Sequence, residues 1–180
     1  VRDPFLVDYP ELSEELTASD FGLADKEVKQ TTLIAKYDKD CYKATAVTFG
    51  IKLSNASSSC IWFGGTDRGI RMQFIDEKHV ELSYVDAAGT AKRLAAWNAE
   101  KAQVTSFAEQ MIEWGVTFQL SEQPDGTNVL QLGVFVNGKL YNGSYLTVYD
   151  VETSCLKRAI VLQAKKGSIF IEEPSYKVLT

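Results

Sequence analysis

The chain has 180 residues, of which 45% are hydrophobic, and its mean hydropathy is −0.13. Its 24 acidic and 19 basic side chains give a net charge of −5, spread along the chain without a Lys/Arg block. No apolar run approaches the roughly 18 residues that a membrane helix needs. We therefore expect a globular protein that neither inserts into a membrane nor binds nucleic acid.

The first stretch of the chain has the least regular pattern. It opens at Val1 with neither an initiator Met nor an apolar signal region, which is typical of a piece cut from a longer protein. A short helical turn is expected within 8–16, and a tight turn at 19–22. We expect residues 1–16 to be an extension or linker and residues 17–180 to be one domain.

From residue 31 onward, apolar and polar residues alternate in short runs, which is the pattern of half-buried strands. In chain order, the predicted strands cover 31–37, 44–53, 60–63, 69–75, 80–84, a run ending near 96, 110–120, 129–136, 160–164 and 168–172. The strongest is 110–120, where Trp114 shares one face with Ile112 and Val116. Trp114 is therefore predicted to lie in the core.

The run 129–136 leads into a tight hairpin. Its apolar face carries Leu130, Leu132, Val134 and Val136, while Gln131, Gly133 and Phe135 lie on the other face. Asn137-Gly138 follows, and this pair favours the two positive-φ positions of a type I′ turn. The hairpin predicts an antiparallel sheet with one buried face.

The segment 94–110 fits neither a helix nor a strand well. Its Ala, Glu and Lys content favours a helix, but its apolar positions do not keep the 3.6-residue period. We expect a strand that ends near Ala96, a single helical turn at 98–102, and then a loop.

About a dozen short strands separated by turn residues predict an all-β, two-sheet antiparallel β-sandwich. The order of the motifs AVTFGIKL, CIWFGG, GIRMQF, VELSYV, EWGVTFQL, VFVNGKLY and GSIFIEE resembles the concanavalin A-like lectin/glucanase jelly roll. The similarity is to its laminin-G-like form, found as a module of secreted or surface-attached bacterial proteins. It covers roughly residues 17 to 173 and lies in pattern and hairpin rather than in an identifying motif.

This resemblance implies saccharide binding on the concave sheet or at the loop rim, sometimes with calcium. The glucanase members use a Glu-x-Asp-x-x-Glu strand, and no such spacing occurs here. Glu172 and Glu173 are adjacent, so on a strand they point to opposite faces and cannot act as a pair. A Gly-x-Ser-x-Gly elbow, a P-loop and a dinucleotide fingerprint are also absent from the sequence. We expect no catalytic residues and no enzyme activity.

Trp62 is the first candidate for contact with a sugar. If Ile61 and Phe63 point into the core, parity places Trp62 on the opposite face, where an aromatic ring could stack on a pyranose. Arg71 and Gln73 are predicted to line the same surface. The alternative reading, equally open, is that Trp62 packs under a crossing loop.

Other candidate ligand-binding residues lie in the predicted turns and loops. Asp67 and Arg68 belong to the turn above Trp62, and Tyr141 and Asn142 follow the Asn-Gly turn as rim candidates. Trp97 is predicted on a loop that could cap a site, although such a tryptophan more often fills a local gap.

The chain offers little for a metal or redox centre. Cys41, Cys60 and Cys155 match no zinc spacing, and they are read as ordinary small residues, with a Cys41–Cys60 or Cys60–Cys155 bridge left open. The single histidine, His79, is read as a solvated side chain without a role.

Two segments that we expect on turns, 38–40 and 125–128, offer oxygen ligands for calcium. Neither has the spaced acidic ladder of a dedicated calcium loop, and Asp-Gly also serves turn geometry alone. No cofactor is predicted, with calcium left as the open alternative.

The sequence thus favours a non-catalytic carbohydrate-binding module of a larger extracellular or cell-surface bacterial protein, monomeric, with a glycan or polysaccharide as partner. The alternative is an adhesin module with a protein receptor, or a structural spacer without a glycan ligand. An exposed aromatic among polar neighbours favours the first, and a buried Trp62 favours the second.

Overall fold

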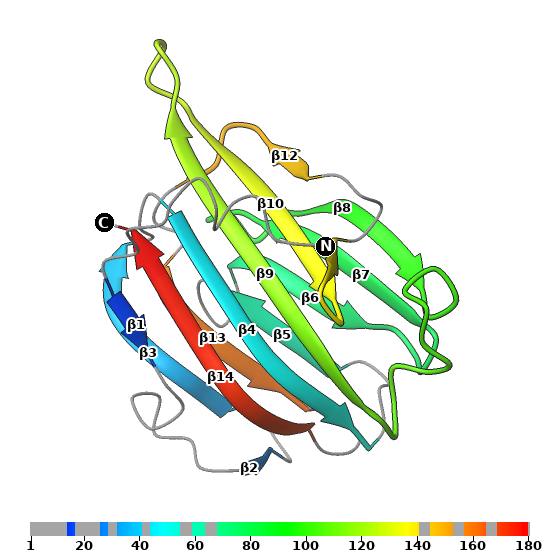
Figure 1. Ribbon diagram of the computed structural model, residues 1–180. Helices are drawn as coiled ribbons and strands as arrows, with labels where there is room; N and C mark the ends of the chain where they lie inside the picture. Colours follow the sequence, from blue (N-terminus) through cyan, green and yellow to red (C-terminus); the bar gives the residue numbers. More distant parts are fainter. Residues whose placement is uncertain are drawn as a thin grey trace.

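The computed structural model describes residues 14–16, 26–28, 32–40, 44–54, 59–63, 68–140, 145–152, 157–164 and 169–179. Within these residues the chain forms strands and no helix, in two stacked antiparallel sheets (Figure 1). The predicted all-β sandwich is confirmed. None of these residues forms a helix long and apolar enough to span a membrane.

In the part of the chain that the structure describes, sheet A has eight strands, with the order β1-β14-β4-β9-β10-β11, while β12 pairs with β10 and β2 with β14. These strands are β1 (Glu14–Leu16), β2 (Lys26–Val28), β4 (Ala44–Leu53), β9 (Met111–Glu122), β10 (Asn128–Val136), β11 (Lys139–Leu140), β12 (Leu146–Val148) and β14 (Ile169–Leu179). The hairpin of β9 and β10 extends well beyond the rest of the sheet (Figure 1).

Among the described residues, sheet B has six strands in the order β3-β13-β5-β6-β7-β8, so β8 is an edge strand of this set. These strands are β3 (Thr32–Asp40), β5 (Ser59–Phe63), β6 (Gly69–Phe74), β7 (His79–Val85), β8 (Ala91–Asn98) and β13 (Lys157–Gln163). The register of β7 and β8 shifts between Leu82 and Ser83, which marks a β-bulge. The exposed part of β8 begins with Ala91, Lys92 and Arg93.

The β10–β11 hairpin forms as the sequence predicts. Asn137 and Gly138 have φ values of 50° and 81°, the two positive φ angles that a type I′ turn requires. Phe135 pairs with Leu140, and the Asn137 side chain accepts a hydrogen bond from the Glu113 amide at 3.0 Å. The four apolar residues of the predicted inner face of β10 are all buried in the main core.

The core lies between the sheets and is rich in aromatic side chains. Phe74, Phe107 and Trp114 form a cluster in which the ring centroids lie 5.6 to 5.9 Å apart. Trp114 is buried, as predicted from its position in 110–120. Phe107 comes from the loop after β8 rather than from a strand, so this loop is held by the core.

Most predicted strands are present within one to three residues of their expected bounds. The expected helical turn within 8–16 is wrong where the structure describes it, because Glu14–Leu16 is strand β1 and pairs with Tyr176–Val178 of β14. The segment 38–40 belongs to strand β3 rather than to a turn. Local composition favoured other conformations there, and pairing with distant strands decided the outcome.

Several expected features lie outside the described residues. These are the turn at 19–22, Cys41, residues 55–58 of a loop expected at 55–59, the turn at 64–67, Cys155 and the turn at 165–167. Ser59, the last residue of that expected loop, is instead the first residue of β5. The division of the chain between residues 16 and 17 stays a prediction.

Candidate functional site

Trp62 lies on the outer face of sheet B, as parity predicted. Ile61 and Phe63 belong to the main core, whereas Trp62 forms a separate small cluster with Cys60 and Val85. The indole Nε1 donates to Gln163 Oε1 at 3.3 Å. Only 7% of Trp62 is exposed, so its ring does not present the open stacking face that the sequence suggested.

Arg71 and Gln73 share that outer face with Trp62. Arg71 is the cross-strand partner of Trp62, and its guanidinium carbon lies 5.6 Å from the centroid of the indole ring. Gln73 pairs with Cys60 on one side and with Glu81 on the other. The structure therefore brings together three of the predicted site residues, but the guanidinium occupies the face that a sugar ring would use.

The structure does not place the other predicted site residues beside Trp62, Arg71 and Gln73. Arg68 is exposed just before β6, and Asp67, Tyr141 and Asn142 lie outside the described residues. Trp97 is not on a loop: it lies in β8 opposite Val80, is 4% exposed, and packs in the main core. The bulge explains the difference, because it turns both Leu94 and Ala95 toward the core and so interrupts the alternation that the sequence reading required.

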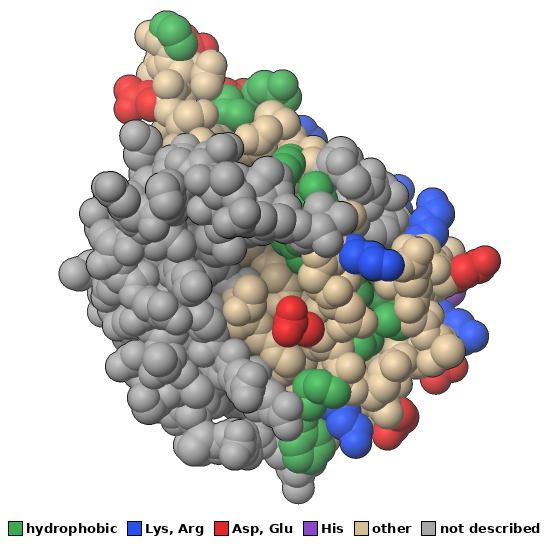
Figure 2. Space-filling model, in the orientation of Figure 1, with side chains coloured by type: hydrophobic (Ala, Val, Ile, Leu, Met, Phe, Trp, Pro, Cys, Tyr) green, Lys and Arg blue, Asp and Glu red, His purple; other side chains and the backbone are tan. Residues whose placement is uncertain are grey.

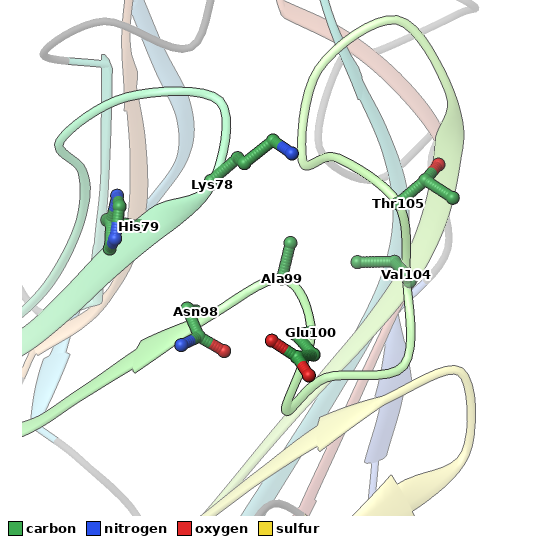
Figure 3. A pocket seen from close by; sticks show the side chains of 7 residues that line it. All are labelled: Lys78, His79, Asn98, Ala99, Glu100, Val104 and Thr105. Atoms are coloured by element: carbon green, nitrogen blue, oxygen red, sulfur yellow. The ribbon is translucent and has the colours of Figure 1, made fainter.

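Two hollows adjoin where β7 begins and β8 ends, and both are lined by His79 and Asn98. The loop-side hollow has a volume of about 450 Å³ and is also lined by Lys78, Ala99, Glu100, Val104 and Thr105 (Figure 3). The strand-side hollow has a volume of about 370 Å³ and is also lined by Ile75, Val80, Glu81, Ala96, Trp97 and Lys101. We refer to the two together as the twin hollow.

His79 is held at the twin hollow by Asp76. Its Nδ1 lies 2.8 Å from Asp76 Oδ1 and 3.0 Å from Oδ2. The amide of Lys78 donates to the same Oδ1 at 2.8 Å, and this bond, with the hydrogen bond and charge of His79, lowers the pKa of the Asp76 carboxyl. Because Nδ1 is engaged with the carboxylate, Nε2 is the nitrogen that a ligand can reach.

Asn98 closes strand β8 and starts the following turn. Its Oδ1 accepts from the Lys101 amide at 2.9 Å, and its carbonyl accepts from the Ala102 amide at 3.2 Å. This is the single helical turn expected at 98–102, with Asn98 as its cap. Since the side-chain oxygen is used by the cap, the amide NH2 group remains for a ligand.

The loop wall of the twin hollow is tied back to the start of β7. The Ala99 amide donates to the Lys78 carbonyl at 2.8 Å, and the Phe107 amide donates to the Glu77 carbonyl at 2.6 Å. The Phe107 ring is 1% exposed between Phe74 and Trp114. The loop is therefore fixed at both ends of the hollow by backbone bonds and by the core.

The walls combine apolar surface with different hydrogen-bonding groups. In Figure 3 the Val104 side chain points toward Ala99 across the loop-side hollow, and Asn98 and Glu100 lie side by side at its edge. An imidazole, an amide, a carboxylate and an ammonium group thus surround apolar walls. Small-molecule sites commonly have this arrangement, with a few polar groups around an apolar surface.

Sequence reasoning assigned His79 no role, and nothing in its spacing indicated a hollow. The Asn98 cap was the available signal, since a cap residue directly after a strand marks a strand end with a fixed turn. Figure 2 shows basic and acidic side chains interspersed along the margin formed by this part of the molecule, so neither sign of charge dominates it.

The structure gives Asp125 a role in turn geometry. Its Oδ1 accepts from the Thr127 hydroxyl at 2.6 Å and from the Thr127 amide at 3.0 Å, and these bonds lower the pKa of the carboxyl. Gly126 follows with a φ of 86°. In the described part of the chain, no three His, Cys, Asp or Glu side chains are grouped so that they could hold a metal ion.

No protein-family model matches the chain, and no curated protein matches its sequence. Solved structures of botulinum neurotoxin domains are similar in fold. The receptor binding domain of botulinum neurotoxin D has a TM-score of 0.54 and 14% identity, covering 93% of this chain and 45% of that one. The serotype D ligand binding domain in complex with N-acetylneuraminic acid has a TM-score of 0.55 and 14% identity, covering 93% and 43%.

A third similar structure is the receptor binding domain of the C/D mosaic serotype, with tetraethylene glycol bound on its Hcn sub-domain. Its TM-score is 0.53 at 13% identity, covering 93% of this chain and 44% of that one. At these identities the likeness shows the fold alone. This chain spans less than half the length of each of these structures, and its two-sheet antiparallel sandwich is the fold that it shares with them.

Proposed function

We propose that this chain is a non-catalytic carbohydrate-binding module of a larger extracellular or cell-surface protein. The observation that carries the proposal is the twin hollow, where His79 and Asn98 stand between two apolar-walled depressions. This position is at the loop rim, one of the two places that the lectin-like resemblance implies for a saccharide.

The available groups suit sugar hydroxyls. A hydroxyl both donates and accepts, so a site needs donors and acceptors within a short distance of one another. The Asn98 NH2 group and the Lys78 ammonium donate, the Glu100 carboxylate accepts, and His79 Nε2 accepts in its neutral form. The apolar walls of Val104 and Ile75 suit the C–H face of a pyranose; Ile75 is 40% exposed.

The similar neurotoxin domains are a receptor binding domain and a ligand binding domain, which supports a binding role, and the second is a complex with N-acetylneuraminic acid. Less than half of that chain is covered by the match, so the comparison does not locate a sugar on this one. Trp62, Arg71 and Gln73 on the outer face of sheet B form a second candidate surface for the same ligand class, with Asp67, Arg68, Tyr141 and Asn142 kept as predicted neighbours.

A protein-binding adhesin or spacer module is the second candidate. It is favoured by one observation, the covered ring of Trp62 beneath Arg71, because a glycan module was expected to expose this aromatic. The two candidates differ in whether any saccharide binds.

A glycan array with calcium or with chelator tests the proposal, using wild type, Asn98→Asp and Arg71→Gln. Asn98→Asp keeps the cap oxygen and removes the NH2 donors, so it should lose at least about tenfold in affinity while keeping the fold. Arg71→Gln should bind as wild type does. Lys92→Ala, on the exposed start of β8, is the matched surface control.

If Arg71→Gln loses binding and Asn98→Asp does not, the site lies on the outer face of sheet B. Loss of binding in chelator alone would add calcium to the site. Absence of binding to plant, host and bacterial glycans under both conditions would contradict the proposal and favour the protein-binding or spacer module.

A further inference from the structure

We infer that the twin hollow binds two linked sugar units at once, one in each hollow, so that its minimal ligand is a disaccharide segment. This inference rests on the proposed function and adds the size of the ligand to it. It is carried by the adjacency of the two hollows and by the difference between their walls.

The two hollows share one wall, formed by His79 and Asn98. These residues are the first cross-strand pair of β7 and β8, so their side chains belong to neighbouring strands at a sheet edge. The wall is one residue thick along the strands, and a strand rises about 3.3 Å per residue, so the shared wall is narrow. A ligand that fills one hollow reaches the other across a single pair of side chains.

Each hollow is large enough for a separate unit. Their volumes of about 450 and 370 Å³ each fall within the range of about 300–1,000 Å³ that is typical of small-molecule sites. A single pyranose would fill one hollow and leave the other to solvent. A ligand with two units uses both, with its linking oxygen placed over the shared wall.

The hollows differ in chemistry. The loop-side hollow offers Lys78, Glu100 and Thr105, which suit a unit bound mainly through its hydroxyl groups. The strand-side hollow offers the exposed apolar side chains of Ile75 and Ala96, with Lys101 and Glu81 at its borders, which suits a unit bound through an apolar face. Two unlike subsites side by side predict a ligand with a defined direction.

The shared wall is fixed before a ligand arrives. Asp76 holds the His79 ring, and the Lys101 amide holds the Asn98 side chain through its oxygen. A fixed wall reduces the entropy that the side chains lose on binding. The first sugar unit already costs the ligand its translational and rotational freedom, so the linked second unit adds affinity without that cost.

The test compares saccharides of increasing length by isothermal titration calorimetry. Three series are used: glucose, maltose and maltotriose; glucose, cellobiose and cellotriose; galactose, lactose and 3′-sialyllactose. In any series that binds, the second unit should raise affinity by about tenfold or more, and the third unit should add about threefold or less. Equal affinity for one and two units would overturn the inference and leave the glycan-binding function intact.

Two substitutions assign the units to the hollows. Glu100→Trp fills the loop-side hollow and Ala96→Trp fills the strand-side hollow, and both residues are exposed. Each should reduce disaccharide affinity to the monosaccharide level, whereas Lys92→Trp should not change it. If neither substitution changes disaccharide affinity, the two-unit site is refuted even though a saccharide binds. If no saccharide of the array or the series binds, the proposed function itself fails.

Discussion

The outer face at Trp62 and the twin hollow at His79 differ in how well the sequence predicts an accessible surface. Trp62 is a large aromatic at a position that alternation correctly places on the outer face, yet it is covered by its neighbours. His79 is a polar residue with no distinguishing pattern, yet it lines two depressions. The comparison shows that alternation determines which face a side chain occupies, while neighbouring strands and loops determine whether a ligand can reach it.

The physical origin of the difference is position within the strand. Trp62 lies inside a sheet, between β13 and β6, so both neighbouring strands supply side chains that cover it. His79 and Asn98 lie at strand ends, where the sheet stops and a loop turns away. Hollows form where the packing of the sheet ends.

The largest expected effect tests how strongly the twin hollow depends on the core. Phe107→Ala removes the ring that anchors the loop wall, and we expect the free energy of unfolding to fall by about 3–5 kcal/mol. Urea unfolding followed by circular dichroism measures the loss. Phe170→Ala is the control because this residue is 38% exposed, and it should lower stability clearly less than Phe107→Ala does. A loss below about 1 kcal/mol in Phe107→Ala would show that the loop is not held by the core.

Trp62→Ala tests whether the outer face serves stability rather than binding. Removal of this covered side chain should lower the free energy of unfolding by about 1.5–3 kcal/mol, and glycan binding should persist at a temperature where the variant is folded. Tryptophan fluorescence of the wild type should be blue-shifted and resistant to acrylamide, since the three indoles are buried. A red-shifted, quenchable component lost in Trp62→Ala would restore Trp62 as a binding platform.

Asn98 separates the two roles of a strand-end residue. Asn98→Ala removes both the cap and the NH2 group, so it should cost about 0.5–2 kcal/mol of stability as well as binding. Asn98→Asp should keep most of the stability and lose binding. Thermal unfolding measures the stability of the two Asn98 variants, and calorimetry measures their binding. An equal loss of stability in both variants would contradict the separation of the cap from the NH2 group.

The smallest effect concerns the pH dependence of the Asp76 contacts. Because folding lowers the pKa of this carboxyl below 3.8, the Asp76 carboxylate stabilises the fold above its unfolded pKa, and this contribution is lost as the pH falls through the folded pKa. Asp76→Asn should therefore be slightly less stable than wild type at neutral pH, and the two should converge in strong acid. When His79→Gln is present in both proteins, Asp76→Asn should still lower the stability at neutral pH, but by a smaller amount. The reason is that the Lys78 amide still donates to the Asp76 carboxylate. If the difference in stability between wild type and Asp76→Asn stays constant from neutral pH to strong acid, ionisation of Asp76 does not stabilise the fold.

Much of the fold follows from period-two alternation. Strand β4 and the β10–β11 hairpin have their expected bounds or turn type because their inner faces are continuous and their turn residues specify the geometry. Residues 14–16 escaped prediction because their partner, the end of β14, lies far away in sequence. The position of Trp97 in a strand was not predicted because a bulge places two successive residues of β8 against the core.

The candidate site was much less predictable than the fold. Parity and residue type gathered Trp62, Arg71 and Gln73 correctly on one face, but exposure depends on where the Arg71 guanidinium lies, which composition does not specify. The twin hollow joins residues 75–81 with 96–105, and its shape depends on the backbone bonds between Ala99 and Lys78 and between Phe107 and Glu77. Such bonds join main-chain atoms, so side-chain identity gives no direct signal of them.

The edge strand β8 also bears on the solubility of the protein. An unpaired strand edge can recruit the edge of another molecule and start aggregation, and proteins counter this with charged side chains and bulges. β8 carries Lys92 and Arg93 on its exposed part and a bulge against β7, so its edge is both charged and irregular. We expect these features to protect the edge of β8, whose far end lines the twin hollow, against edge-to-edge aggregation.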